Sequence, residues 1–184
     1  VNKMISCLFE KDVFKILSLF GISPGSRFKR NEIKEKTLLY NVNLDKALNK
    51  LINLNLLKKE KNYYQINFEN EIKEKILDLV IKEYKRLREI PFKVYLLLID
   101  FLEGISKNKE IEAYLFGSYA KLIYKENSDI DIAVINEKVN AKFINKLERR
   151  YGLKIELHYF NRDEFYKNKK DPLIKEIIKN GVKL

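Results

Sequence analysis

Cysteine is almost absent from this sequence: Cys7 is the only one in 184 residues. An intramolecular disulfide and a cysteine-based metal cluster are therefore excluded. No uninterrupted apolar run approaches the roughly 18 residues that suggest a membrane-spanning helix. The first residues, VNKMISCLFEKD, have neither the apolar stretch nor the small-residue cleavage site of a secretory signal. We therefore expect a cytoplasmic protein without a membrane segment, in which Cys7 is a small buried hydrophobe.

Acidic residues are outnumbered, and the excess of basic residues is uneven. Residues 1–68 carry 13 basic and 6 acidic side chains, residues 69–90 carry 6 of each, and residues 91–184 carry 18 and 14. The first third is thus the most basic per residue, as expected for a module that faces a polyanion. A solvated lysine-rich surface would give the same composition.

Hydrophobic periodicity in the first third predicts three short helices followed by a β-hairpin. Apolar residues recur at helical spacing over 10–20, 29–36 and 43–53, and Gly21 is expected to stop the first helix. Residues 56–59 and 63–67 then read as two strands around a charged turn.

The stretch LDKALNKLINLNLLKKEKNYYQI resembles the winged helix-turn-helix family. Many members of that family have a helix of the type xVxxxLxxLxxxGLI, a charged hairpin and a tyrosine-rich strand. Asn55 occupies the usual glycine position, and asparagine tolerates the left-handed conformation that ends a helix. The resemblance covers about residues 8–68 and implies DNA binding. A winged helix used for dimerisation or protein docking is the alternative.

The resemblance places the third helix in the major groove and the hairpin against the DNA backbone. Asparagine can pair with adenine edges, and lysine with guanine or phosphate. The expected DNA-binding residues are Asn43, Lys46, Asn49, Lys50, Asn53, Lys58, Lys59 and Lys61.

The rest of the chain predicts a connecting helix and then an α/β domain. Residues 69–90 keep helical period on a charged surface, and FKVYLLLIDFLEGI predicts a helix buried beneath a sheet. Strands are expected at 111–116, 130–135 and 153–160, with helices at 118–124, 140–151, 162–166 and 172–179. The expected domains are therefore 1–68, a connecting helix over 69–90, and 91–184, an α+β chain with a mixed sheet in its second domain.

Chemistry is concentrated in AYLFGSYAKLIYKENSDIDIAV, residues 113–134. A strand ends at Gly117-Ser118, where the glycine lets backbone approach a ligand and the serine can cap a helix start. Free amides at a helix start can hold phosphate. Asp129 and Asp131 follow, two residues apart in an extended segment, so their carboxylates share one face. Such a pair favours a cation, and Mg²⁺ prefers oxygen ligands that it shares with substrate phosphates.

These residues resemble the nucleotidyltransferase superfamily that includes DNA polymerase β, whose pattern is hGS, a spacer and DhDh. The closest form is the minimal nucleotidyltransferase, with GSxARG followed by SDIDL at the same spacing. The resemblance spans about residues 92–160. It implies that Gly117, Ser118, Lys121 and Ser128 bind the nucleotide. Lys121 replaces the usual arginine, so the positive charge is kept but the bidentate hydrogen bonding of a guanidinium is lost. Leu122 replaces the usual glycine, and its side chain would either narrow the nucleotide site or pack inward.

The family also implies a third carboxylate on a later strand. Glu156 stands alone among apolar residues in LKIELHYF and is expected to complete the metal site or act as base. An edge-strand glutamate that faces water is the alternative. His158 shares the face of Glu156 and is expected to be a packed or rim residue.

Together these features imply transfer of a nucleoside monophosphate, with ATP as default donor, to an acceptor hydroxyl. The resemblance implies that Asp129, Asp131 and Glu156 bind two Mg²⁺ ions. Minimal nucleotidyltransferases often act as antitoxins that add AMP to a tyrosine of a HEPN-type toxin, so such a toxin is the implied partner, and a homodimer is expected. The alternatives are a catalytically inactive DNA-binding regulator whose second domain senses nucleotide or dimerises, and small-molecule transfer such as antibiotic adenylylation.

Overall fold

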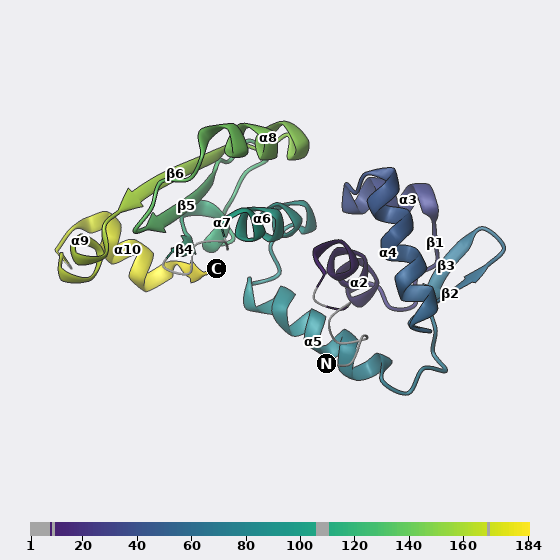
Figure 1. Ribbon diagram of the computed structural model, residues 1–184. Helices are drawn as coiled ribbons and strands as arrows, with labels where there is room; N and C mark the ends of the chain where they lie inside the picture. The colour runs from purple at the N-terminus through teal and green to yellow at the C-terminus, as the bar shows by residue number, and fades with distance from the viewer. Residues whose placement is uncertain (1–7, 9, 106–110, 169) are drawn as a thin grey trace. The chain divides into compact units, whose positions relative to one another are not determined.

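The computed structural model describes residues 8, 10–105, 111–168 and 170–184, so the prediction for Cys7 lies outside the described residues. The chain divides into two compact units, Val1–Arg86 and Leu87–Leu184. Both units mix helices with a small sheet (Figure 1). No helix among the described residues combines the length and apolar character needed to cross a membrane.

The first unit contains the predicted helices and hairpin, together with one strand that the sequence did not predict. Its helices are α2 (Lys11–Ile22), α3 (Arg30–Thr37), α4 (Asn41–Asn53) and α5 (Lys73–Arg86), and its strands are β1 (Phe28–Lys29), β2 (Leu57–Glu60) and β3 (Tyr63–Ile66). The three strands form an antiparallel sheet in the order β1-β3-β2. The strand β1 is only two residues long, so no alternation could reveal it. The expected left-handed backbone at Asn55 is confirmed, with φ of 58°.

The prediction that Gly21 stops the first helix is wrong, because α2 continues through Gly21 to Ile22. A Cβ atom added at Gly21 would lie 3.4 Å from the side chain of Ile81 and 3.5 Å from that of Val80. These are ordinary van der Waals distances, so Gly21 lies at the contact between α2 and α5 but a small side chain would also fit there. The helix α5 begins at Lys73 and belongs to the first unit, whereas the sequence predicts a separate connecting helix over 69–90.

The second unit is built on a four-stranded mixed sheet. Its strands are β4 (Glu112–Leu115), β5 (Ile130–Ile135), β6 (Ile155–Phe160) and β7 (Val182–Lys183), in the order β6-β5-β4-β7. The pair β5 and β6 is parallel, and β4 is antiparallel to both β5 and β7. The three predicted strands are confirmed, whereas the two-residue β7 gave no sequence signal.

Helices cover both faces of this sheet. They are α6 (Phe92–Ile105), α7 (Gly117–Ala120), α8 (Ala141–Tyr151), α9 (Arg162–Lys167) and α10 (Pro172–Asn180). Figure 1 shows α6 and α8 on one side of the sheet and α9 and α10 on the other. On the second side, Phe165, Ile174 and Ile177 pack on Ala133 and Ile135. The helix predicted over 118–124 is only the single turn α7.

The helix α6 is buried, as predicted, and it includes one acidic residue. The carboxylate of Asp100 accepts a hydrogen bond of 2.6 Å from the Tyr151 hydroxyl and lies 3.1 Å from the Arg150 guanidinium. Because a buried carboxylate needs such partners, this cluster fixes α8 against α6. The face of the sheet that carries Ala133 and Ile135 also carries Asp131, near the start of β5, where the candidate site residues lie.

Candidate active site

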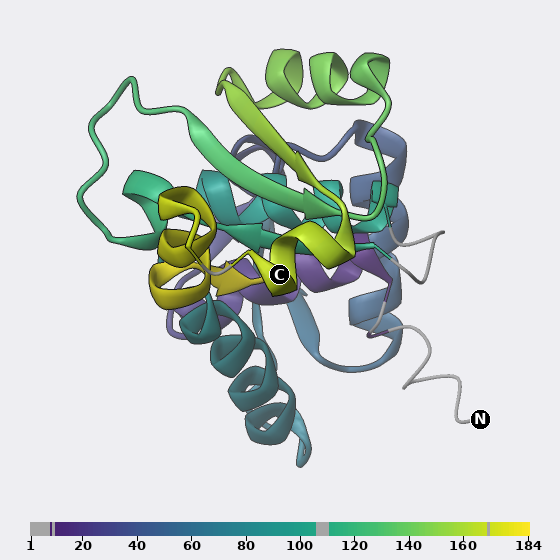
Figure 2. The same cartoon turned by 90° about the vertical axis from the view of Figure 1, so that its left-hand side faces the viewer.

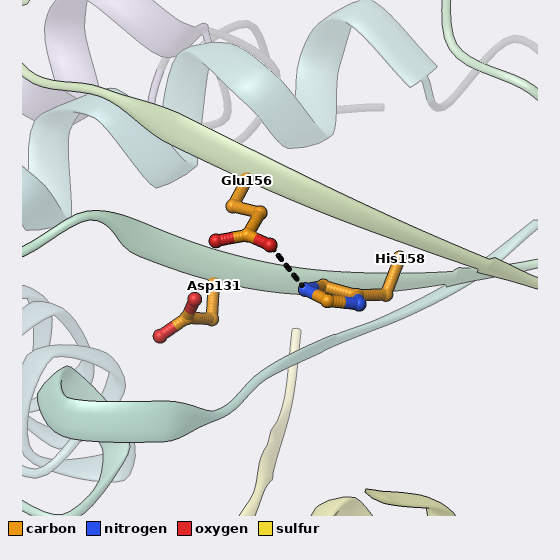
Figure 3. A group of neighbouring side chains, drawn as sticks. All are labelled: Asp131, Glu156 and His158. Atoms are coloured by element: carbon orange, nitrogen blue, oxygen red, sulfur yellow. Dashed lines mark ion pairs between the residues drawn. The ribbon is translucent and has the colours of Figure 1, made fainter.

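Asp131 and Glu156 lie side by side on adjacent strands. In the parallel register of β5 and β6 the two residues are directly paired, so their side chains leave the sheet on the same face. His158 follows two residues later on that face. One possible metal-ligating atom from each of Asp131, Glu156 and His158 lies within 4.8 Å of the other two, and Figure 3 shows the three side chains converging.

The pKa of the Asp131 carboxyl is raised, first by burial and then by the negative charges of Glu156 and Asp129. His158 and a hydrogen bond from the Ser118 backbone N–H act in the opposite direction. A carboxylate pair of this kind disfavours full ionisation unless a cation is shared. Asp131, Glu156 and His158 are thus a group that could hold a metal ion.

His158 is packed, as the sequence predicts, and it also lies close to Glu156. Its ring does pack edge-on against Phe116, with centroids 5.1 Å apart. Its Nε2 atom, however, lies 3.2 Å from Glu156 Oε1, as the dashed line in Figure 3 marks. The period-2 pattern of β6 placed His158 on this face, but sequence alone could not supply the distance.

Gly117 fits against Asp131 with no space for a side chain. Its φ is 67°, and a Cβ atom there would lie 1.9 Å from Asp131 Oδ2. Backbone at this turn therefore approaches the carboxylate as closely as glycine permits. The expected serine cap is absent: α7 begins at Gly117, its N-cap is Phe116, and no side chain caps it. The backbone N–H of Ser118 instead bonds Asp131.

Asp129 and Ser128 lie just before β5. Asp129 is exposed and is not a member of the group formed by Asp131, Glu156 and His158, although its charge acts on Asp131. The Ser128 hydroxyl accepts a hydrogen bond of 2.8 Å from the backbone N–H of Lys125. This hydrogen bond closes the turn that comes directly before Asp129 and the start of β5.

The two departures from the GSxARG pattern lie on the surface. Lys121 Nζ is 2.5 Å from a Glu176 oxygen on α10. Leu122 has φ of 59° and its side chain is 49% exposed, so it neither packs inward nor lies against the carboxylates. Its left-handed backbone explains why glycine suits this position.

Arg88 is a residue that the sequence analysis missed. Its Nη1 atom donates a hydrogen bond of 2.5 Å to the Ala120 carbonyl at the end of α7. Arg88 and Glu89 both have left-handed backbone, with φ of 59° and 54°. No local pattern marks an arginine as the partner of a turn that lies 32 residues later.

The candidate DNA-binding residues lie on α4 and on the hairpin, and the structure divides them into two groups. Asn43 donates a hydrogen bond of 2.6 Å to Asp12, and Lys50 is bonded to Glu10. On the hairpin, Lys58 is paired with Glu60 at 3.0 Å and Lys59 lies 5.5 Å from the Tyr64 ring centroid. The exposed members are Asn43, Lys46, Asn49, Asn53, Lys59 and Lys61, whereas Lys50 and Lys58 are half-buried.

Comparison with known families bears on the second unit. Residues 101–184 match the family model described as Polymerase beta, Nucleotidyltransferase. No curated protein matches the chain. The matched segment contains the whole sheet, Gly117, Asp131 and Glu156. It supports a polymerase β-like nucleotidyltransferase fold for this part of the chain, and nucleotidyl transfer as the general class of reaction.

Proposed function

We propose that the second unit transfers a nucleoside monophosphate, with ATP as the expected donor, to an acceptor hydroxyl and releases pyrophosphate. The observation that carries this proposal is the pairing of Asp131 with Glu156 beside the Gly117 turn, within the segment that matches the nucleotidyltransferase model. Gly117 and Ser118 would hold the outer phosphates, and the exposed Lys121 and the half-buried Ser128 would also contact the nucleotide.

The residues present fit a divalent cation. Asp131 and Glu156 offer oxygen ligands on one face, and their mutual repulsion favours a shared positive charge. Asp129 would add a further carboxylate when the nucleotide brings a second Mg²⁺ ion. When bound, such ions neutralise phosphate charge and make the acceptor hydroxyl more acidic. Glu156 is the exposed carboxylate of the pair, and it is placed to accept the hydroxyl proton.

The proposed acceptor is a hydroxyl on a partner protein, in the manner of a HEPN-type toxin and its nucleotidyltransferase antitoxin. Glu156 is exposed and lies directly beside Asp131, so a hydroxyl on another molecule can reach its carboxylate. Transfer to an antibiotic-like small molecule would instead require a preformed pocket next to Glu156.

We also propose that the first unit is a winged helix that binds DNA. The order of helices and strands, the sheet order β1-β3-β2 and the basic composition support this assignment. Lys46, Asn49 and Asn53 on α4 and Lys59 and Lys61 on the hairpin are exposed members of the expected interface, as is Asn43, which is bonded to Asp12. A homodimer would then present two such units to a two-fold DNA site.

Calorimetry of the full chain with Mg²⁺ and each of ATP, CTP, GTP and UTP tests the site, followed by transfer of label from the nucleotide that binds. Asp131→Asn and Glu156→Gln should each reduce transfer by about 100-fold or more, because both carboxylates act where charge develops. Asp163→Asn on α9 is the matched control, since its exposed carboxylate is paired only with Lys167. Undiminished transfer in both site variants would contradict the proposal.

A catalytically inactive regulator is the second candidate. Leu122 at the glycine position and the Lys121–Glu176 pair favour it, because both remove features that bind phosphate in the GSxARG pattern. Absence of binding by every nucleotide, together with intact DNA binding, would select this candidate.

A further inference from the structure

The strand β6 is at one edge of the second unit's sheet, in the order β6-β5-β4-β7 (Figure 2). Its even-numbered residues bond to β5: Ile130 N–H donates to the Lys154 carbonyl and Asn136 N–H to the Phe160 carbonyl, both at 2.9 Å. Because backbone groups alternate along a strand, the groups of Ile155, Leu157 and Tyr159 point away from β5.

One of these outward groups already has a partner within the chain. The Ile155 N–H donates a hydrogen bond of 3.0 Å to Glu148 Oε1, which confirms the outward direction. Within the described residues, no further strand pairs with β6. The strand also lacks proline, lysine and a bulge, which commonly protect an edge. The edge is therefore able to accept another strand at Leu157 and Tyr159.

This edge runs directly beside the candidate catalytic residues. Glu156 and His158 leave β6 on the face that carries Asp131. A segment paired with β6 would place every second side chain on that face, about 5 Å from its neighbour on β6. A hydroxyl side chain there would lie next to the Glu156 carboxylate.

A basic pocket continues the edge at the start of β6. It has a volume of about 430 Å³ and is lined by Asn145, Glu148, Arg149, Gly152, Leu153 and Lys154. The lining includes two basic side chains, Arg149 and Lys154, and one carboxylate, Glu148, whose Oε1 accepts the hydrogen bond from Ile155. The lining therefore keeps a net positive charge. An acidic side chain at one end of the added segment complements it.

We propose that the acceptor is an extended peptide segment of a partner protein that adds to the edge of β6, with an acidic residue near Arg149 and Lys154 and a hydroxyl residue beside Glu156. This inference rests on the proposed transfer reaction and names the form of its substrate. The hydroxyl oxygen bonds to the α-phosphorus, the bond to the β-phosphate oxygen breaks, pyrophosphate leaves, and the hydroxyl proton passes to Glu156.

The test measures docking apart from chemistry. Capped octapeptides with one fixed tyrosine and Val, Ile, Glu or Gln elsewhere are added to the full chain without nucleotide, and amide exchange at Leu157 is followed by NMR. Exchange should slow about tenfold when free peptide is about ten times its Kd. A pool with phenylalanine in place of tyrosine should dock equally well. A pool N-methylated at alternate residues should not dock.

Two matched variants locate the docking edge. Tyr159→Pro removes an outward N–H that does not bond to β5, so it should abolish protection while the sheet is retained. Tyr159→Ala removes the same side chain but keeps the N–H, and it should retain protection. The N-methylated pool makes the same test on the wild-type chain if the proline variant does not fold.

The outcomes separate the docking edge from the proposed reaction. Protection by the tyrosine and phenylalanine pools, with nucleotide transfer only to tyrosine, supports the inference. Slower amide exchange at Leu157 without nucleotide transfer supports peptide docking at the β6 edge and counts against the proposed reaction. Absence of protection at millimolar peptide overturns the inference. Protection that rises with protein concentration alone, together with a dimer in solution, assigns the edge to a second copy of the chain and also overturns it.

Discussion

Asp131 on β5 is directly paired with Glu156 on β6, so two carboxylates occupy adjacent positions on one face of a parallel pair of strands. Burial and the charge of Glu156 both raise the pKa of Asp131. A folded state that raises the pKa of a carboxyl is destabilised when that carboxyl ionises. Ionisation of Asp131 therefore costs stability in the folded chain, and a bound cation would reduce that cost.

Asp131→Asn should stabilise the metal-free chain while it abolishes transfer. The expected gain in the free energy of unfolding at pH 7 is about 0.5–1 kcal/mol, typical of neutral substitutions at strained functional positions. The gain should disappear below the ordinary aspartate pKa of about 3.9, where the carboxyl is protonated in both states. Urea unfolding in EDTA at several pH values measures it, with Asp163→Asn as control. A loss of stability at pH 7 would contradict the expected effect of the raised pKa.

Gly117→Ala should be much more damaging than Gly152→Ala. Both glycines have positive φ, 67° and 57°, so both variants carry the backbone cost of about 1 kcal/mol. At Gly152 the nearest atom to an added Cβ is Lys93 Nζ, at 3.8 Å, whereas at Gly117 it is Asp131 Oδ2, at 1.9 Å. Only Gly117→Ala should therefore displace Asp131, with an expected loss of transfer of about 100-fold. Equal activity of the two variants would show that the contact with Asp131 is unimportant.

The positions of Asp131 and Glu156 show what the sequence could predict. Period-2 alternation placed both residues on strands. The spacing of Asp129 and Asp131 predicted a shared face for those two carboxylates, and the family resemblance pointed to Glu156. The strand pairing that brings them together is a long-range contact, and a single sequence does not contain its register. For the same reason Arg88, which bonds the end of α7, and the two short strands β1 and β7 were missed.

Leu122→Gly should stabilise the fold. The left-handed backbone at Leu122 costs about 1–2 kcal/mol for an L-residue, and glycine removes that cost but loses about 0.5–1 kcal/mol of unfolded-state entropy. The net gain is expected to be about 0.5–1 kcal/mol, measured by thermal unfolding. Leu122→Ala is the control, since it shortens the exposed side chain and keeps the strain. Equal stability of the glycine and alanine variants would argue against strain at this position.

Glu112 should make the second unit sensitive to acid. Its pKa is lowered, chiefly by a hydrogen bond from Lys183 and further by Tyr166 and Arg162, against the effect of burial. A lowered pKa contributes stability above the unfolded value of about 4.3, and this stability is lost as pH falls through the folded pKa. Glu112→Gln should therefore lower the free energy of unfolding by about 1–2 kcal/mol at pH 7. It should also reduce the loss of stability that the wild-type chain shows as the pH falls. Glu126→Gln on an exposed loop should change neither.

Gly21 and Leu122 show a second limit of sequence reasoning. A glycine after an apolar helix predicts a stop, yet Gly21 lies inside α2, where α5 is in contact with it. A leucine gives no sign of left-handed backbone, yet Leu122 has it. In both cases the residue type alone does not determine the backbone conformation.

The lysines of the first unit differ in whether their ammonium groups already have a carboxylate partner. The salt dependence of DNA affinity should distinguish the two kinds of lysine. Lys46 on α4 and Lys61 in the hairpin turn are exposed. Lys50 is also on α4 but is bonded to Glu10. Each phosphate contact contributes about 0.9 to the slope of log K against log salt concentration. The double variant Lys46→Ala/Lys61→Ala should therefore lower the slope by about 2 for duplex DNA.

Lys50→Ala is the matched control on the same helix, and it should lower the slope much less, because its ammonium group already has a carboxylate partner. Fluorescence anisotropy with a labelled duplex at several salt concentrations measures both slopes. If Lys50→Ala lowered the slope as much per lysine as the double variant does, the ion pair between Lys50 and Glu10 would have to break when DNA binds. Unchanged slopes in both would remove these lysines from any phosphate contact, and they would favour a protein-docking role for the first unit.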